Sequence, residues 1–545
     1  MIDGRPCLMR LKTRLHAAGR DERGAVAVQF AFLALPLAIL SFGLLDMNRA
    51  SLQRRQLQDA LDAATLIAAR STAVTDPALD TVGDAAFLAE TTGLGISLTG
   101  ANSTFAAGSD NKVIGTVTVS IKPIITNLWT QSDMTVRATS EVVRSVNKLE
   151  VALVLDNTGS MASNLGSGGT KINALIDASK DLVDTLYAAA ARASETDAVK
   201  IAVVPFSMTV NIGTSNASAN WLSPTLPSAY GVDVFATPQN RFTLHTQTGT
   251  SWAGCVESRP DPYDIADTAP STAIPASLFV PYFAPDEPDS KSVTYTSGGW
   301  TYFYSANNNW ITNDQSSSGD WFIRQGEVAK YATSNKSKVT SGAKTTTTSG
   351  PNDGCGITSV LRMTNVRTSS GASTVKDKLD QMVATGNTNV AMGTVWGWHM
   401  VSPNAPFADG SAYGTRNVSK VLVLLTDGDN VMSETSDPND STYSGYGYVW
   451  QKRLKNASNV ALDVGASGTE RRDAMDSRQT KTCAAAKAKG VIIYAIGVGV
   501  STHSKTVLQG CATSADKYYD VTDSAQLSAV FNTIAGSIQN LRIAK

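Results

Sequence analysis

Oxygen-bearing side chains follow one strongly apolar segment of the sequence at regular spacing. The run Leu149–Leu155 (LEVALVL) predicts a buried strand, and Asp156, Thr158 and Ser160 come directly after it at alternate positions. In an open α/β sheet, ligands bind at the carboxyl ends of the strands, so three alternating side chains there can direct their oxygens to one point. Carboxylate and hydroxyl oxygens are the ligands that hard cations such as Mg²⁺ prefer. The spacing therefore indicates a cation site.

Two later loops can complete this site. Thr388 lies in the loop 386–389, between two helical stretches, and contributes a hydroxyl group. Asp427 follows the apolar strand predicted at Val418–Thr426 and contributes a carboxylate at that strand's carboxyl end. We therefore expect both residues beside the first loop.

Strands and helices alternate along the C-terminal part of the chain, which predicts a parallel sheet with helices on both faces. The predicted strands are Leu149–Leu155, Val199–Phe206, Val418–Thr426, Val491–Val498 and Lys517–Val521. The predicted helices are Lys171–Ala191, one that includes Ala484–Lys489, and one from Ser524 to about Asn540. The fold class is α/β, with a doubly wound and mostly parallel sheet.

From Leu149 to Asn540 the sequence resembles the von Willebrand factor A (VWA) domain family. The order Asp-x-Thr-x-Ser, then Thr388, then Asp427 resembles that family's metal-ion-dependent adhesion site, with Thr158 where serine is usual. The resemblance implies Mg²⁺, or Mn²⁺ or Ca²⁺, bound by the hydroxyls of Thr158 and Ser160. It implies that Thr388 binds directly or through water, that Asp156 and Asp427 accept hydrogen bonds from metal-bound water, and that an acidic side chain of a partner fills the open position. A VWA fold whose loops bind no metal is the alternative.

A long insertion interrupts the alternation between about residues 207 and 373. It is rich in Ser, Thr, Asn, Pro and tryptophan, and a structureless loop of this size is improbable inside a compact domain. We expect a β-rich inserted subdomain within the VWA domain at 149–545. Its tryptophans either form its own small core or present a recognition surface, and the first interpretation is favoured. They are Trp221, Trp252, Trp300, Trp310 and Trp321.

Four of the five cysteines lie on one side of an apolar N-terminal segment, and Cys7 lies on the other. An even number suits two disulfides in an oxidising compartment, and four separate buried thiols are the alternative. The predicted pairs are Cys255 with Cys355 and Cys483 with Cys511.

The apolar segment, residues 24–45, carries no charged side chain and as a helix would reach about 33 Å, enough for a hydrocarbon core of about 30 Å. More basic residues precede it than follow it, which places the tail 1–23 in the cytoplasm and the bulk of the chain outside. We expect a single-pass anchor in a bacterial inner membrane, with the bulk in the periplasm or beyond. A cleaved signal peptide is the alternative, although it would have a shorter apolar region.

The anchor continues into a predicted amphipathic helix that reaches Arg70. Residues 20–70, with RDERGAVAVQFAFLALPLAIL followed by LLDMNRASLQRRQLQDALDAATLIAA, resemble the N-terminal module of TadE/TadG-like proteins of Tad/Flp pilus assembly. Gln29 stands where such segments usually carry Glu, which leaves processing by a prepilin peptidase open. Residues 71–148 are expected to form a small α+β, pilin-like spacer with strands at Val113–Ile121 and Met134–Val142.

Composition and motifs restrict the function. The net charge of −1 argues against broad binding to nucleic acid. The four histidines lie outside any HEXXH motif, and the sequence has no G-x-S-x-G elbow and no Walker phosphate loop, so we expect no enzyme. The resemblances imply a membrane-anchored protein of Tad/Flp pilus assembly or adhesion that binds other pilus-assembly or envelope proteins through a divalent cation. The alternative is a structural envelope protein in which the VWA domain is a scaffold without a functional metal site.

Overall fold

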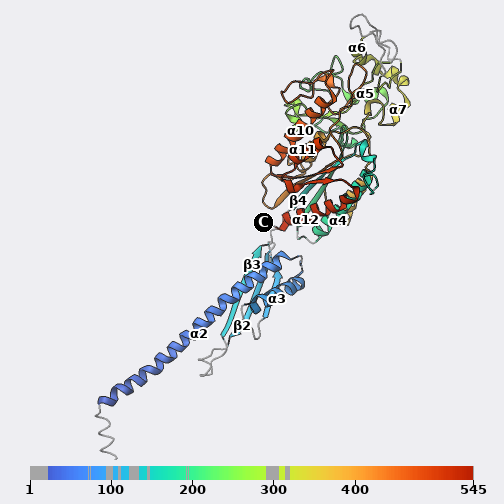
Figure 1. Ribbon diagram of the computed structural model, residues 1–545. Helices are drawn as coiled ribbons and strands as arrows, with labels where there is room; N and C mark the ends of the chain where they lie inside the picture. The colour runs from blue at the N-terminus through green and yellow to red at the C-terminus, as the bar shows by residue number, and fades with distance from the viewer. Residues whose placement is uncertain are drawn as a thin grey trace, which may run out of the picture. The chain divides into compact units, whose positions relative to one another are not determined.

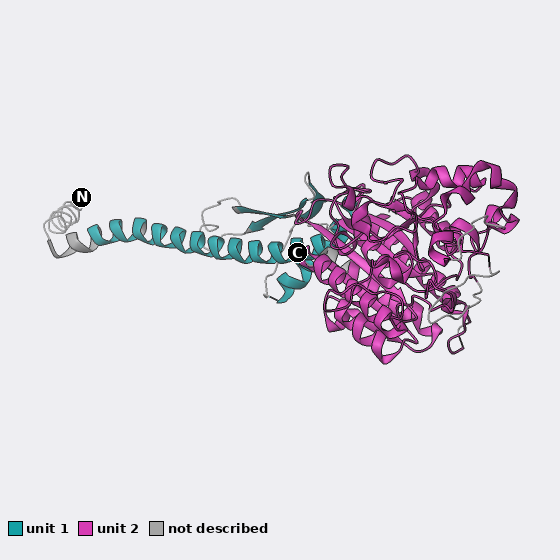
Figure 2. Cartoon of the chain, turned by 90° about the horizontal axis from the view of Figure 1, so that it is seen from above, with its two compact units in different colours: residues 1–144 teal, residues 145–545 magenta. Residues whose placement is uncertain are grey.

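The computed structural model describes residues 22–71, 73, 75–93, 102–108, 112–121, 134–143, 148–167, 169–191, 193, 195–289, 306–312 and 320–543. The chain divides into two compact units, residues 1–144 and 145–545 (Figure 2). The predicted tail lies outside the described residues except for Glu22 and Arg23, and so does Trp300.

The first unit is built on one long helix, α2 (Glu22–Arg70), which begins two residues before the apolar segment and contains all of it (Figure 1). Its stretch Gln29–Arg70 contains a window long and apolar enough to cross a membrane, and Phe30 and Phe32 there are exposed. The last part of the helix buries an apolar stripe of Leu57, Leu61 and Ala64. One helix therefore combines a candidate membrane span with one side of a small core.

A helix and an antiparallel sheet complete that core. The elements are α3 (Asp76–Gly93), β1 (Asn102–Ala107), β2 (Lys112–Ile121) and β3 (Met134–Val143), with strand order β1-β2-β3. The expected spacer is thus packed against α2, and β1 is an additional strand that the sequence did not predict.

Acidic side chains of α3 cover the free edge of β1. Carboxylates four residues apart on the helix accept hydrogen bonds from alternate residues of the strand. The pairs are Asp76 with the backbone N–H of Ala107 (2.9 Å), Asp80 with that of Phe105 (2.8 Å), and Asp84 with the hydroxyl of Ser103 (2.6 Å). An edge strand whose N–H groups are satisfied in this way is a poor template for pairing with another chain.

The second unit contains a six-stranded sheet with the order β12-β11-β10-β4-β5-β9. Its strands are β4 (Lys148–Asp156), β5 (Val199–Phe206), β9 (Leu361–Asn365), β10 (Val418–Thr426), β11 (Val491–Val498) and β12 (Tyr518–Val521). All neighbours are parallel except β9, which is antiparallel to β5. This sheet confirms the predicted doubly wound, mostly parallel α/β fold, and each strand of it predicted from the sequence is present.

Helices cover both faces of this sheet, as the uninterrupted burial of β4 requires. On one face lie α4 (Lys171–Ala191), α8 (Ser369–Asp380) and α12 (Leu527–Ile543), and on the other lie α9 (Val390–Val401), α10 (Gly468–Ala488) and α11 (Thr502–Cys511). Leu153 and Leu155 of β4 enter the first core, whereas Val154 enters the second. Both disulfides predicted from the sequence are formed, Cys255–Cys355 and Cys483–Cys511.

The insertion differs from the prediction in extent and in content. The main fold resumes at Leu361, because β9 joins the sheet and α8 packs against α4, so the predicted end at residue 373 is too late. Its described residues form short helices and a sheet of very short strands rather than a β-rich subdomain. The elements are β6 (Val210–Asn211), β7 (Cys255–Glu257), β8 (Val280–Pro281), α5 (Arg241–Thr248), α6 (Trp321–Gln325) and α7 (Ser341–Thr345). Its four described tryptophans are buried, but only Trp310 lies in a core cluster of the insertion itself, whereas Trp221 and Trp252 pack into the core on the α9 face of the main sheet.

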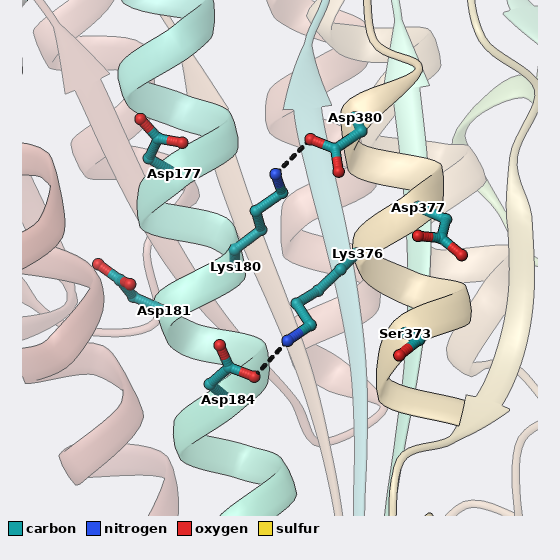
Figure 3. Close-up of a pocket in the computed structure, with 8 residues that line it drawn as sticks. All are labelled: Asp177, Lys180, Asp181, Asp184, Ser373, Lys376, Asp377 and Asp380. Carbon is teal, nitrogen blue, oxygen red and sulfur yellow. Dashed lines mark hydrogen bonds and ion pairs between the residues drawn. The ribbon is translucent and has the colours of Figure 1, made fainter. Parts of the chain in front are cut away.

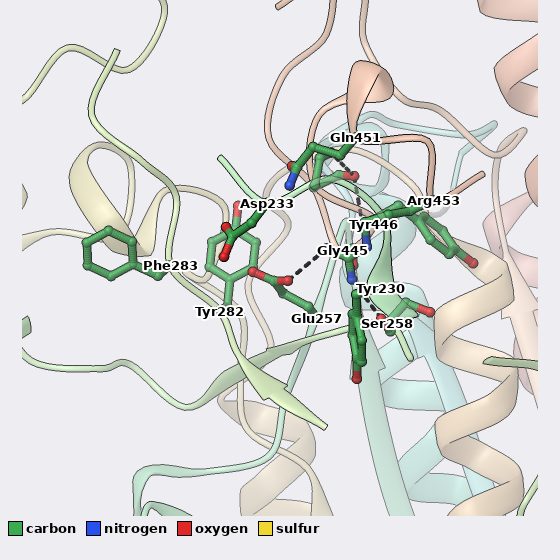
Figure 4. Close-up of polar contacts among 12 residues, drawn as sticks. Tyr230, Asp233, Glu257, Ser258, Tyr282, Phe283, Gly445, Tyr446, Gln451 and Arg453 are labelled. Atoms are coloured by element: carbon green, nitrogen blue, oxygen red, sulfur yellow. Dashed lines mark hydrogen bonds and ion pairs between the residues drawn. The ribbon is translucent and has the colours of Figure 1, made fainter. Parts of the chain in front are cut away.

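A second irregular segment, between β10 and α10, packs onto this insertion through a buried charge network (Figure 4). Glu257 is fully buried and accepts hydrogen bonds from the hydroxyl of Tyr443 (2.5 Å) and from Nη1 of Arg453 (2.8 Å). Nη2 of Arg453 donates to the carbonyl of Ser258 (2.8 Å), and Nη2 of Arg241 lies 3.6 Å from Glu257. The network joins segments almost 200 residues apart in the sequence, with the Glu257–Arg453 contact spanning 196 residues.

Candidate metal site

The predicted site residues converge at the point where the strand order reverses. From β4 the chain continues to β5 and β9 on one side, and it then crosses to β10, β11 and β12 on the other side. β4 and β10 are parallel neighbours, so the loops that leave them meet at the same edge of the sheet. This switch point is where open α/β sheets bind ligands.

Asp156, the last residue of β4, is fixed within this edge. It is fully buried, and its Oδ1 accepts a hydrogen bond from the backbone N–H of Thr158 (2.8 Å). Its Oδ2 accepts one from the hydroxyl of Thr426 (2.6 Å). Burial, together with the nearby Asp427 carboxylate, raises the pKa of Asp156 to about 6. The carboxylates of Asp156 and Asp427 repel each other, so a positive charge bound beside them would be favourable because it offsets this repulsion.

Hydroxyl groups connect the first loop to Asp427. The hydroxyl of Ser160 donates to Oδ1 of Asp427 (2.5 Å) and lies 3.0 Å from the hydroxyl of Thr158. Because Ser160 has one proton and donates it to Asp427, Thr158 is the donor in the second contact. Thr158 is buried and Ser160 is exposed, so this oxygen cluster opens to solvent on the Ser160 side.

The loop that carries Thr388 lies against both of the others. The backbone N–H of Gly159 donates to the carbonyl of Gly386 (2.9 Å), and that of Val431 donates to the carbonyl of Thr388 (2.8 Å). A Cβ atom on Gly428 would lie 3.9 Å from the Thr388 hydroxyl, which places this hydroxyl beside Asp427's own loop. All five predicted residues are therefore brought to one edge of the sheet, four of them in direct polar contact with another.

Lys171 is an additional member of the site that sequence reasoning missed. It is the first residue of α4, and its Nζ donates to Oδ2 of Asp427 at 2.8 Å. The side chain of Asp427 is fully covered and that of Lys171 is 12% exposed. The one signal available in the sequence is a lysine at a helix N-terminus, where the helix dipole disfavours a cation.

The donor set fits a hard divalent cation. Two carboxylates and three hydroxyls are present, and Mg²⁺, Mn²⁺ and Ca²⁺ all take oxygen ligands of this kind. The described histidines make contacts elsewhere: His245 with Thr250, His399 with Arg259, and His503 with Asp476. This arrangement can hold a cation, and a cation held there can bind an anionic group. Lys171 already balances part of the negative charge of the two carboxylates.

A second group with metal-ligand chemistry lies between α10 and α11. One ligand atom each of Asp473, Asp476 and His503 lies within 4.8 Å of the others. Arg472 also lies there, 2.9 Å from Asp473 and 4.0 Å from Asp476, so the carboxylates already have a cationic neighbour. Sequence reasoning missed this cluster because its members lie on two helices and are brought together only by packing.

A groove between α4 and α8 lies apart from both clusters (Figure 3). Ion pairs cross it, Lys376 with Asp184 at 2.7 Å and Lys180 with Asp380. Five aspartates and two lysines line it, together with Ser373, so its charges are partly compensated within the groove itself. The lining residues are Asp177, Lys180, Asp181, Asp184, Ser373, Lys376, Asp377 and Asp380.

Residues 24–71 match the family model described as "Putative Flp pilus-assembly TadE/G-like", which confirms the TadE/TadG-like module predicted at the N-terminus. No curated protein matches the sequence. Similar solved structures include the pilus adhesin SpaC from Lactobacillus rhamnosus GG, with 12% identity, a TM-score of 0.33, and coverage of 81% of this chain and 34% of that one. This chain therefore spans about a third of that adhesin's length.

Two other similar structures come from pilus proteins. One is the PilB minor pilin from Streptococcus sanguinis, with 11% identity, a TM-score of 0.33, and coverage of 81% of this chain and 78% of that one. The other is the vWF domain of the type V pili tip protein Mfa5 from Porphyromonas gingivalis, with 11% identity, a TM-score of 0.31, and coverage of 73% and 97%. At these scores, the fold assignment depends on the strand order and the helix layers.

Proposed function

We propose that this chain is a membrane-anchored component of Tad/Flp pilus assembly that binds a partner protein through a divalent cation held at the carboxyl ends of β4 and β10. The observation that carries the proposal is the convergence of Asp156, Thr158, Ser160 and Asp427 at the switch point of the sheet. The TadE/TadG-like module at residues 24–71 supports the pilus context.

The anchor and the disulfides support an extracytoplasmic site. One apolar helix near the N-terminus is long enough to cross a membrane, and the second unit contains two disulfides, which persist in oxidising compartments. We place the N-terminus in the cytoplasm and the second unit in the periplasm or beyond. A membrane-impermeant maleimide added to spheroplasts should label an S458C variant, because Ser458 is exposed, and should spare Cys7. Labelling of Cys7 without labelling at position 458 would show the reverse orientation.

Each site residue has a role in this proposal. The hydroxyls of Thr158 and Ser160 would bind the cation directly, and that of Thr388 directly or through water. Asp156 and Asp427 would hold the waters of the cation and orient the first loop. The bound cation would supply a Lewis-acidic position that a carboxylate of the partner can fill. No covalent step is involved, so the protein is a binder and not an enzyme.

Metal binding by the full chain in detergent tests the proposal. Ser160→Ala removes one hydroxyl ligand from an exposed position, and we expect it to weaken Mn²⁺ binding at least tenfold by electron paramagnetic resonance of free Mn²⁺. Ser163→Ala is the matched control, because the Ser163 hydroxyl only donates to the carbonyl of Ser160 (2.6 Å). Equal Mn²⁺ binding by wild type and S160A would refute the adhesion-site assignment.

A structural envelope protein with a VWA scaffold is the second candidate. One observation favours it: the ammonium group of Lys171 lies 2.8 Å from Asp427, so that carboxylate is neutralised by the chain itself. In this case Mn²⁺ would bind neither wild type nor S160A at the predicted site. The same titration therefore separates the two candidates.

A further inference from the structure

The contact between Lys171 and Asp427 has no explanation in the packing of α4 alone. The α4 helix has no acidic residue in its first turn, so nothing within the helix stabilises a cation at its N-terminus. The positive end of the helix dipole disfavours an ammonium group there. The side chain is also nearly covered, at 12% exposure. Asp427, reached across 256 residues of sequence, is the group that offsets these costs.

The backbone around Lys171 is fixed, whereas its side chain can move. The backbone N–H of Lys171 donates to the carbonyl of Ser163 (3.0 Å), and Asn164 bridges to Thr170, which folds this loop back on itself. A lysine ammonium is a compact charge on a flexible four-carbon stem. Rotation about the bonds of this stem can turn the ammonium group away from Asp427 while the backbone hydrogen bond of Lys171 to Ser163 is kept.

Formal charges show what this lysine does to the site. Asp156 and Asp427 contribute two negative charges and Lys171 one positive charge, which gives −1. A divalent cation changes this sum to +1, whereas without Lys171 the same cation would give a neutral site. Like charges at short range repel strongly where water is excluded, so the ammonium group of Lys171 weakens the binding of a divalent cation. Once the cation is bound, the site carries an excess positive charge.

We propose that Lys171 is a tethered competitor cation that couples metal binding to the binding of an anionic group. It neutralises Asp427 when no metal is bound, and it keeps the affinity for a divalent cation low. A carboxylate from a partner offsets the excess charge, so cation and carboxylate bind together more tightly than either binds alone. By linkage the coupling is reciprocal, and each ligand raises the affinity of the other. This inference is based on the proposed metal site.

Mn²⁺ titration of the full chain in detergent, with free Mn²⁺ followed by electron paramagnetic resonance, tests the proposal. Lys171→Gln should tighten Mn²⁺ binding at least tenfold, and Lys171→Arg, which keeps the charge, should leave it within about threefold of wild type. Acetate, used as the carboxylate probe and corrected for its own Mn²⁺ binding, should tighten Mn²⁺ binding more in wild type than in K171Q. Asp476→Asn, measured in parallel, identifies any Mn²⁺ held by Asp473, Asp476 and His503 instead.

The outcomes separate this inference from the proposed function. If S160A loses Mn²⁺ binding while K171Q binds Mn²⁺ no more tightly than wild type, the metal site stands and the role of Lys171 is refuted. If neither wild type nor K171Q binds Mn²⁺, with or without acetate, the proposed function itself fails. Should K171Q not fold, as judged by circular dichroism, the acetate effect in wild type decides: no tightening of Mn²⁺ binding overturns the coupling.

Discussion

Loss of Arg453 should destabilise the second unit strongly, because this side chain joins its two irregular segments. Arg453→Met keeps an unbranched apolar stem and removes the guanidinium group with its charge. It deletes the 2.8 Å contact with Glu257, the 2.8 Å hydrogen bond to the carbonyl of Ser258 and the contact with the ring of Tyr230, 5.1 Å from its centroid. Glu257 and Arg453 are both buried, with side-chain exposures of 0% and 3%.

The magnitude follows from what remains around Glu257. Removal of one partner of a buried ion pair costs about 3–5 kcal/mol, because the other charge stays buried. Tyr443 still donates to Glu257 and Arg241 still lies 3.6 Å away, so we expect the lower end, about 3 kcal/mol.

Urea denaturation followed by tryptophan fluorescence measures this loss as a shift of the midpoint. Arg362→Met is the matched control, because Arg362 pairs with Asp409 at 2.5 Å but is 56% exposed. Exposed pairs contribute about 1 kcal/mol or less. Equal losses for R453M and R362M would refute the inference that burial makes the Glu257 network important.

Three further predictions concern stability. Asp80→Ala should cost about 1.5–3 kcal/mol, because Asp80 accepts the backbone N–H of Phe105 on the edge of β1. Asp59→Ala, at an exposed position, should cost little, as thermal unfolding followed by circular dichroism will show. Burial holds the pKa of His245 at about 3, below its usual 6.5, so the unfolded chain binds more protons below pH 6.5 and wild type should lose about 1.4 kcal/mol per pH unit relative to His245→Asn. Parallel pH profiles of the two urea midpoints would contradict this, and His503→Asn, at a partly exposed position, is the control. Replacement of both Cys255 and Cys355 by Ala opens a loop with a sequence separation of 100 and should cost about 4–5 kcal/mol in urea. A reducing agent should cause at least this loss in wild type, because it also opens Cys483–Cys511.

The parts of the fold that were predictable have local signals. The run Leu149–Leu155 is apolar on both faces because β4 is buried on both faces, and the same holds for β5, β10 and β11. The strand β9 gave no such signal, because at the sheet edge its residues are only partly buried. The insertion gave little more, because its strands are two or three residues long and its core depends on contacts distant in sequence.

The candidate site also combines residues that the sequence could predict with residues that it could not. The residues Asp156, Thr158, Ser160 and Asp427 follow apolar strands, and strand ends can be located from the sequence. Lys171 follows no strand, and its partner lies 256 residues away, so only the folded chain brings the two together. Asp476 and His503 meet in the same way, across two helices that the disulfide Cys483–Cys511 joins at their other ends.

Anomalous diffraction from crystals of the chain grown with Mn²⁺ tests the central claim most directly. We expect one strong anomalous peak among the oxygens of Thr158, Ser160 and Thr388, with the Lys171 ammonium displaced from Asp427. A peak only among Asp473, Asp476 and His503, or Lys171 still bound to Asp427 with no Mn²⁺ at this edge of the sheet, would contradict it.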